Sequence, residues 1–341
     1  MLIGRETECA RLGDLLAAAR EGESGALVIR GEPGIGKSAL LGEALRRAQG
    51  MTVVRARGVE SESELSFAGL ADLLGPLLGG LDALPAPQAA ALAGALALGP
   101  PASPDRFTVY AATLSLLAAA GERAPVLAVV DDAPWIDGSS REALVFVARR
   151  LQREGVVLLL AARTGQRVGS EEAGVPELAL GGLDLAASTE LLAQGRTGAL
   201  APAVAERLFG ATGGNPLALL ELSALLTAAQ RAGTEAIEDP PPVSSNVERA
   251  FARGMEALPA ATRRAVLVAA ACESGATADI LAALRALGLG AEALAPAESA
   301  GVIAIADAEL RFRHPLLRSV AYRAAPAPER RAAHRALAGA L

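Results

Sequence analysis

Lysine is nearly absent from this sequence. Of its 32 lysine and arginine residues, only Lys37 is a lysine, and the chain is also rich in alanine. In such a composition, positions that need only a positive charge carry arginine. A compact ammonium group and a planar guanidinium differ in size and in hydrogen-bond geometry. The one position that keeps lysine is therefore predicted to perform chemistry rather than to carry surface charge.

Other residue types are also scarce, and each scarcity excludes a class of protein. Aromatic residues make up 3% of the chain, so cores of Leu, Ala and Val are expected. The two cysteines, Cys9 and Cys272, lie far apart without metal-ligand spacing, which argues against a disulfide framework and favours a reducing compartment. No apolar run reaches ~18 residues and no signal peptide is evident, so we expect a cytoplasmic protein without a membrane partner.

Acidic residues outnumber basic ones, and the net charge is −6. This balance argues against a protein that coats nucleic acid. The length of 341 residues predicts two or three domains.

The single lysine lies in a glycine-rich motif, Gly31-Glu32-Pro33-Gly34-Ile35-Gly36-Lys37-Ser38. The motif fits G-x-x-x-x-G-K-[ST], the loop whose backbone N–H groups hold phosphates. An apolar strand candidate, residues 25–30, precedes it and a helix candidate, residues 38–48, follows. The alternative is a chance match in a flexible loop, but the strand–loop–helix context favours a phosphate site. Its expected nucleotide contacts are Gly34, Ile35, Gly36, Lys37, Ser38 and Ala39.

Polar residues follow two further strand candidates where the apolar runs end. Asp131 and Asp132 follow the apolar run 125–130, and Arg163 follows the run 156–162. Ligands of open α/β sheets bind at the carboxyl ends of the strands. Asp131 is therefore a candidate Mg²⁺ ligand together with Ser38, while Asp132 and Arg163 are candidates for polarising water and sensing a γ-phosphate. A solvated turn and a surface arginine are the alternatives.

Strand and helix candidates alternate up to Leu183, which predicts an α/β fold with a parallel sheet covered on both faces. Helices are expected in this part over 8–20, 65–78, 106–120 and 139–153, and strands over 51–57 and 178–180, whereas 82–104 gives no clear pattern. Beyond Leu183 we expect helices over 185–195, 201–211, 215–229, 247–256, 260–271, 277–286 and 329–341. A linker with three consecutive prolines is expected over 231–245, and a hairpin around Asp307.

Three features of the second half have ordinary structural explanations. Gly213-Gly214-Asn215-Pro216 fits a turn followed by a proline at the first helical position. His314 alone is typical of a structural or surface histidine. The arginine excess of residues 301–341 fits a solvated helical face, with a DNA contact as the sharper alternative.

Taken together, the segments resemble the ATPase module of the large ATP-binding regulators of the LuxR family, which are signal-transduction ATPases with numerous domains related to the maltose-regulon activator. The resemblance covers essentially the whole chain, and the order of the segments is that of the family. The matching segments are Leu2–Glu8, the phosphate loop, Val129–Asp137, Leu159–Arg163, Gly214–Leu217 and Arg313–Tyr322.

This resemblance implies roles that spacing alone does not provide. Ile3, Gly4 and Arg5 would lie against the adenine, Pro216 would pack on the base, and His314 would reach the β-phosphate of ADP. The implied fold is an AAA-like P-loop NTPase domain over 1–182, a helical domain over 183–242 and a winged-helix domain over 243–324. Residues 325–341 would begin a truncated helical sensor region.

Two departures from the family pattern stand out. Relatives often carry histidine where this chain has Pro134, which leaves position 134 without an assigned role. The sensor repeats and the DNA-binding helix-turn-helix of the family are expected beyond Leu341.

The motifs together with this resemblance imply an ATP/ADP-binding, Mg²⁺-dependent switch of a bacterial transcription regulator. ATP hydrolysis would be slow, and the ATP state with an unidentified inducer would self-associate. Lys37 would neutralise the phosphates, with Asp132 orienting the water. The alternatives are a loader-type ATPase that binds DNA through a winged helix, and a nucleotide-binding scaffold without turnover.

Overall fold

The computed structural model describes residues 2–59, 63–99, 105–169, 174–195, 200–237, 255, 257–272, 275–306 and 308–340. The chain divides into two compact units. The first comprises Met1–Glu32 and Gly36–Gly181, and the second comprises Pro33–Ile35 and Gly182–Leu341. The tip of the glycine-rich loop therefore groups with the second unit by its contacts.

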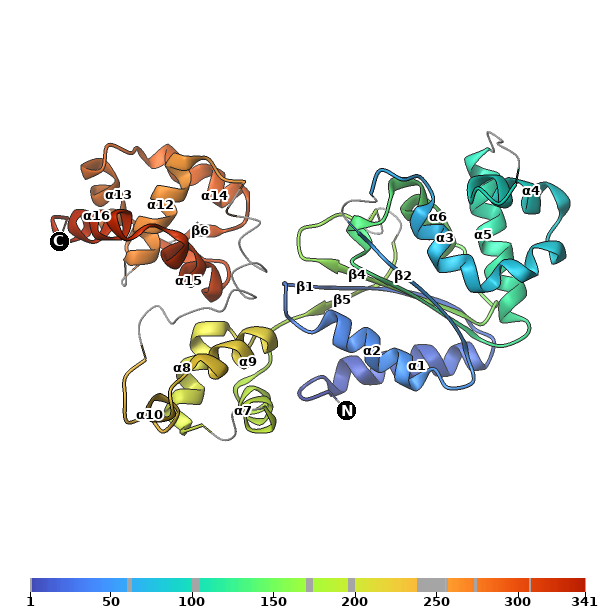
Figure 1. Cartoon of the computed structure of the whole chain (residues 1–341), viewed down its shortest axis with the longest axis horizontal. Coiled ribbons are helices and arrows are strands. Elements are labelled where there is room, and N and C mark those ends of the chain that lie inside the picture. The colour runs from blue at the N-terminus through green and yellow to red at the C-terminus, as the bar shows by residue number, and fades with distance from the viewer. Residues whose placement is uncertain are drawn as a thin grey trace. The chain divides into compact units, whose positions relative to one another are not determined.

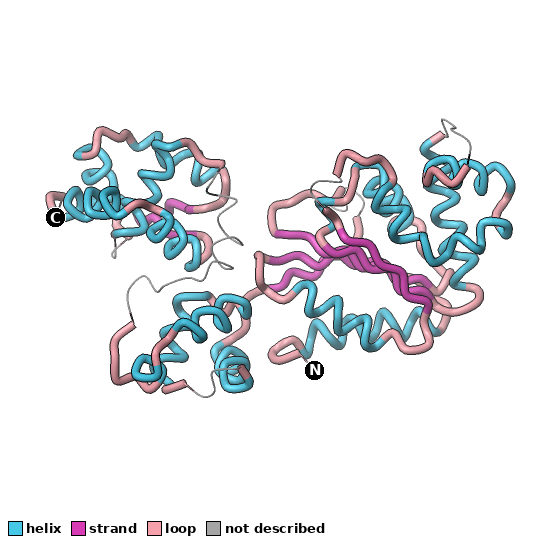
Figure 2. The backbone as a smooth tube through the Cα atoms, viewed as in Figure 1, coloured by secondary structure: helices cyan, strands magenta, loops and turns pink. Residues whose placement is uncertain are grey.

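A five-stranded parallel sheet forms the centre of the first unit, with the order β2-β3-β4-β1-β5. Figure 2 shows the strands side by side. The central strands are continuous apolar runs that are buried along nearly their whole length, as expected where helices cover both faces of a sheet. The strands are β1 (Gly25–Gly31), β2 (Thr52–Arg57), β3 (Val126–Asp131), β4 (Val156–Arg163) and β5 (Glu177–Leu180).

Helices cover the two faces of this sheet (Figure 1). Helices α1 and α2 lie on one face, and α3 to α6 lie on the other. Their bounds are α1 (Glu6–Arg20), α2 (Lys37–Arg47), α3 (Ala68–Leu74), α4 (Ala86–Ala95), α5 (Arg106–Gly121) and α6 (Gly138–Ala148), with short 3-10 helices at η2 (Gly75–Ala83) and η3 (Ala133–Trp135). The buried core between them is aliphatic, as the low aromatic content predicted.

The α/β fold with a parallel sheet was predicted, but three helix bounds were wrong. The helix expected over 65–78 begins at Ala68, because Phe67 adopts a positive φ of 65°, and it tightens into η2 at Gly75. The helix expected over 139–153 ends at Ala148, before the polar run that leads into β4. Residues 82–104, which gave no clear pattern, contain α4.

Four helices open the second unit: α7 (Leu185–Gln194), α8 (Pro202–Thr212), α9 (Pro216–Leu225) and α10 (Ala228–Arg231). The single helix predicted over 215–229 is in fact α9 and α10. Thr227 starts α10 with a capping box, in which its side chain accepts from the N–H of Gln230 while the Gln230 side chain accepts from the N–H of Thr227. Of the expected 231–245 linker, only residues up to 237 are described.

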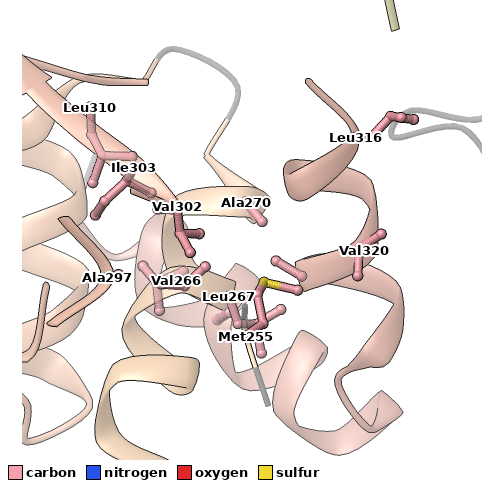
Figure 3. Close-up of a cluster of buried hydrophobic side chains, with 14 of the residues drawn as sticks. Met255, Val266, Leu267, Ala270, Ala297, Val302, Ile303, Leu310, Leu316 and Val320 are labelled. Atoms are coloured by element: carbon pink, nitrogen blue, oxygen red, sulfur yellow. The ribbon is translucent and has the colours of Figure 1, made fainter. Parts of the chain in front are cut away.

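Further along, the second unit contains α12 (Ala260–Ala271), α13 (Thr277–Ala286), η4 (Ala291–Leu294), α14 (Ala295–Ser299), β6 (Ile303–Ala306), β7 (Glu309–Phe312), α15 (Pro315–Ala324) and α16 (Ala327–Ala338). Strands β6 and β7 form the predicted antiparallel hairpin. Figure 3 shows side chains of α12, of the hairpin and of α15 gathered in one apolar cluster. The helix expected over 247–256 lies outside the described residues apart from Met255.

Among the described residues, no single helix has the length and hydropathy to cross a membrane. One pair of helices, Thr277–Ala286 and Ala291–Ser299, has the necessary length and hydropathy when the two are taken together, but the pair is bent by 112°.

Candidate active site

The carboxyl edge of the sheet in the first unit brings the predicted polar residues together. In the strand register, Gly31 at the end of β1 pairs with Arg163 at the end of β4. Asp131 at the end of β3 pairs with Arg57 at the end of β2. Because β4 lies between β1 and β3, the glycine-rich loop, the arginine and the paired acids emerge next to one another. This edge is where open α/β sheets bind ligands.

The glycine-rich loop turns sharply into α2. Gly34 and Gly36 have φ values of 77° and 107°, which side chains other than glycine rarely tolerate. Helix α2 begins at Lys37 directly after Gly36. The first N–H groups of a helix lack intrahelical acceptors, and the positive end of the helix dipole attracts anions. The loop therefore has the backbone geometry of a phosphate-binding site.

Lys37 is buried, with 9% of its surface exposed. Its Nζ donates to the carbonyl oxygens of Gly31 at 2.8 Å and Glu32 at 2.9 Å. Burial lowers the pKa of Lys37, and nearby Arg163 lowers it further, whereas Asp132, Asp131 and Glu32 act in the opposite direction. A phosphate group would strongly stabilise this buried ammonium, whose hydrogen bonds here go to neutral carbonyl oxygens.

Ser38 and Asp131 are directly linked. The Ser38 hydroxyl donates to Asp131 Oδ2 at 2.7 Å. Mg²⁺ prefers oxygen ligands at about 2.0–2.1 Å in an octahedron, so two neighbouring ligands lie about 3 Å apart. The two oxygens therefore fit adjacent positions of a Mg²⁺ shell after a small displacement. No group of three or more His, Cys, Asp or Glu side chains suited to a metal occurs among the described residues.

Asp132 adopts an unusual backbone conformation beside this pair. Its φ is +50°, and its N–H donates to Asp131 Oδ1 at 3.0 Å. Its Oδ2 lies 3.7 Å from Arg57 Nη2. Gly58 packs so closely that a Cβ there would lie 2.1 Å from the carbonyl oxygen of Asp132. Asp132 is thus held in a strained turn with a partly exposed carboxylate, which suits a group that orients water.

Three predicted nucleotide contacts, Ile3, Gly4 and Arg5, lie at the start of the chain. Gly4 has a positive φ of 62°, and Ile3 is half-buried. The guanidinium of Arg5 donates to the carbonyl oxygen of Gly181 at 2.6 Å and to Glu8 Oε1 at 3.0 Å. Arg5 thus fastens the start of α1 to the residue after β5, and its role against adenine stays a prediction.

The remaining predicted residues belong to the second unit or flank the loop. Ile35 is buried and Ala39 is exposed. Pro216 is the first residue of α9. His314 precedes α15, and its Nδ1 accepts from the N–H of Leu316 at 3.2 Å. Burial lowers the pKa of His314 to about 4, so the neutral ring that accepts this bond is the form present at neutral pH.

Several residues that shape the site were missed from the sequence. Asp137 is buried and accepts from the N–H groups of Phe67, Gly69 and Ser140, tying the segment after Asp132 to the start of α3. Arg57 was not distinguished from the other arginines. The signal for Asp137 was its position before a helix, where aspartate often caps. Gly58 had a weaker signal, as a glycine at the end of a strand.

Comparisons with known proteins agree with this geometry. Residues 1–160 match the family described as the AAA ATPase domain. The structure of the Walker-type ATPase PABY2304 of Pyrococcus abyssi has a TM-score of 0.58 at 17% identity and covers 93% of this chain and 95% of its own. This likeness concerns the fold. A STAND protein with a tetratricopeptide repeat sensor from Pyrococcus horikoshii, PH0952, aligns with a TM-score of 0.41 at 16% identity, over 95% of this chain and 44% of its own.

An uncharacterized protein of Rhizobium meliloti (strain 1021) is 29% identical over 199 residues, which is 48% of this chain. The matched stretch spans 18% of that relative. The glycine-rich loop, Lys37 and the Ser38–Asp131 pair all lie within residues 1–160, the part that matches the AAA ATPase domain. The chain carries an AAA-type P-loop ATPase domain.

Proposed function

We propose that this chain is the ATP/ADP-binding switch module of a bacterial transcription regulator, with slow Mg²⁺-dependent hydrolysis that controls self-association. The observation that carries the nucleotide site is the buried Lys37, held 2.8–2.9 Å from two loop carbonyls beside a Ser38–Asp131 pair. A buried ammonium next to a hydroxyl–carboxylate pair is the arrangement that a magnesium–triphosphate would complete.

Each residue of the site has a distinct role in this proposal. Lys37 exchanges its carbonyl contacts for the β- and γ-phosphate oxygens. Ser38 and Asp131 would hold Mg²⁺, which when bound neutralises charge on the phosphates. Asp132 orients the attacking water, and Arg163, at the end of the strand between the loop and the acids, contacts the γ-phosphate.

The finer assignments rest on the resemblance to the LuxR-family regulators. Ile3, Gly4 and Arg5 would contact the adenine, Pro216 would pack on it, and His314 would reach the β-phosphate. A winged-helix domain over 243–324 is supported by the helices α12 and α13 followed by the β6–β7 hairpin. The domains would be 1–182, 183–242 and 243–324, with 325–341 opening a sensor region.

The switch would operate in the cytoplasm by differential affinity for two conformations. ADP would favour a closed monomer, whereas ATP with an inducer would favour an open, self-associating form. DNA would be bound by a helix-turn-helix outside this sequence. The net charge of −6 and the single lysine support this assignment over a loader that binds DNA with this chain.

The test combines nucleotide content with two substitutions at one position. We expect the denatured protein to release nucleotide at about one per chain, as a P-loop site with a single lysine implies. Lys37→Ala should abolish binding of a fluorescent ADP, and Lys37→Arg should fail to restore it because a guanidinium does not fit the space of an ammonium.

Arg153→Ala is the matched control, since it also removes one positive charge but lies 84% exposed just before β4, away from the carboxyl edge. It should bind as the wild type does. Unchanged affinity in Lys37→Ala, with circular dichroism confirming the fold, would show that the nucleotide site lies elsewhere.

A further inference from the structure

The turn between α8 and α9 holds an asparagine whose position is unusual for a helix cap. Asn215 is fully buried, with 0% of its surface exposed. Gly213 and Gly214 before it have φ values of 57° and 72°, so the chain reaches Asn215 through two consecutive left-handed residues. This geometry is available to glycine and to few other residues.

The side-chain amide of Asn215 makes two hydrogen bonds, one through its oxygen and one through its nitrogen. Its Oδ1 accepts from the N–H of Ala218 at 3.2 Å, which caps α9. Its Nδ2 donates to the carbonyl oxygen of Pro33 at 2.8 Å. One bond requires an acceptor and the other requires a donor, so aspartate could make only the cap and serine is too short to reach both. The side chain therefore does more than end a helix.

Pro33 and Gly34 belong to the glycine-rich loop, and α9 contacts them further. The N–H of Leu217 donates to the carbonyl oxygen of Gly34 at 3.2 Å. A Cβ at Gly34 would lie 2.7 Å from Leu217 Cβ and 2.9 Å from Asn215 Oδ1. The start of α9 thus holds the carbonyls of Pro33 and Gly34, at the point where the residues expected to contact nucleotide begin.

The same turn holds a second segment of the chain. The N–H of Leu183 donates to the carbonyl oxygen of Gly214 at 2.9 Å. A Cβ at Gly182 would lie 1.9 Å from the carbonyl oxygen of Gly213, so the segments touch backbone to backbone. Residues 33–35 and 182–183 are the places where the chain enters the second unit. Both are fixed to one turn, which makes this turn a suitable anchor for a switch.

We propose that Asn215 is a positioning residue that holds the phosphate loop in its nucleotide-binding conformation, so that retention of nucleotide depends on α9. This inference rests on the proposed nucleotide-binding function. A loop whose carbonyls are fixed presents its N–H groups without an ordering cost on binding. When the hydrogen bond from Asn215 to Pro33 is lost, the bound nucleotide must itself order the loop. This ordering cost weakens binding, so nucleotide dissociates faster.

The experiment separates the two roles of Asn215, the cap of α9 and the hydrogen bond to Pro33. Asn215→Asp keeps a cap acceptor of equal strength but lacks the donor to Pro33, and Asn215→Ser keeps a cap without adding a charge near phosphate. Both variants leave the carbonyl oxygen of Pro33 without its donor, so we expect the thermal unfolding midpoint to fall in each, and to fall further in Asn215→Asp because that variant buries a charge. Both should release a fluorescent ADP about tenfold faster in stopped flow, the effect of losing one buried hydrogen bond.

Asp184→Asn is the matched control, because Asp184 caps α7 through the N–H of Ala187 in the same unit. This reverse exchange at an ordinary cap should leave the release rate unchanged. Wild-type release rates in both Asn215 variants would overturn the proposal. The same acceleration in Asp184→Ala, which lowers the midpoint by removing the cap of α7 in the same unit, would also overturn it, because release would then follow the stability of the unit alone.

The two proposals fail in different ways. If Lys37→Ala abolishes binding while the Asn215 variants behave as the wild type, only the positioning role is lost. If Lys37→Ala binds ADP normally, the nucleotide site itself is wrongly assigned, and the positioning role falls with it.

Discussion

Asp137 should be the most destabilising polar residue to remove from the first unit. It is 3% exposed. Its Oδ1 accepts from the N–H groups of Phe67 at 2.8 Å and Ser140 at 2.9 Å, and its Oδ2 accepts from the N–H of Gly69 at 3.1 Å. One carboxylate thus caps α6 and holds the start of α3. Asp137→Ala removes all three acceptors at once.

The magnitude follows from what the three donors lose. The N–H groups of Gly69 and Ser140 are buried and would be left without an acceptor, at about 1–3 kcal/mol each. We therefore expect a loss of about 4 kcal/mol in the free energy of unfolding. For a unit of this size that lowers the unfolding midpoint by roughly 8–16 °C.

The chain contains a single tryptophan, Trp135, two residues before Asp137, so its fluorescence reports unfolding of the first unit. Urea titration followed by this signal gives the free energy of unfolding. Asp105→Ala is the matched control, because Asp105 caps α5 at an exposed position through the N–H of Thr108. The control should lose about 1 kcal/mol. Equal losses in the two variants would refute the claim that the buried bonds of Asp137 hold this region.

Three further predictions concern the site and the second unit. Gly58→Ala should lower the free energy of unfolding by at least about 2 kcal/mol and reduce ATP turnover, because the new Cβ would lie 2.1 Å from a backbone oxygen. The control is Gly42→Ala, where the new Cβ meets nothing within 4 Å. Urea titration should show no loss of stability in this control. Asp131→Asn should keep metal-free ADP binding in calorimetry but lose its enhancement by Mg²⁺, and a retained enhancement would contradict the metal role. The pKa of His314 is about 4 in the folded protein and about 6.5 in the unfolded chain. As the pH falls, the unfolded chain binds this proton first, so the free energy of unfolding should fall by about 3 kcal/mol from pH 6.5 to 4. His314→Asn should flatten this slope, measured by circular dichroism in urea, whereas His334→Asn should keep it.

The sheet was predictable because its strands are short, continuous apolar runs. Val126–Asp131 and Val156–Arg163 end in polar residues, and parallel strands place such ends at one edge. That rule placed Asp131, Arg163 and the glycine-rich loop together without any knowledge of the strand order. It did not say that β4 lies between β1 and β3, because strand order depends on how the connecting helices pack.

The error in the start of α3 has a cause that lies far from this helix in the sequence. The sequence around Leu65–Leu78 has helical spacing throughout, yet α3 starts only at Ala68. Asp137 accepts from the N–H of Phe67 and fixes it outside the helix, although the two are 70 residues apart in sequence. A helix start that is set by a distant side chain cannot be found from the pattern of the helix itself.

The turn before α9 shows the same limit in a functional setting. Gly213-Gly214-Asn215-Pro216 fits an ordinary capped turn, and the cap is present. The second bond of Asn215 goes to Pro33, 182 residues away, so local sequence could not reveal it. Gly213 ends α8 in the left-handed conformation, as glycine does at many helix ends, but the second glycine, Gly214, is more than the two helix caps need. A turn that approaches another backbone closely does need it, since at Gly214 a Cβ would lie 2.0 Å from the carbonyl oxygen of Leu183. Glycines in excess of what a local motif requires therefore indicate that a second segment of backbone packs against that motif.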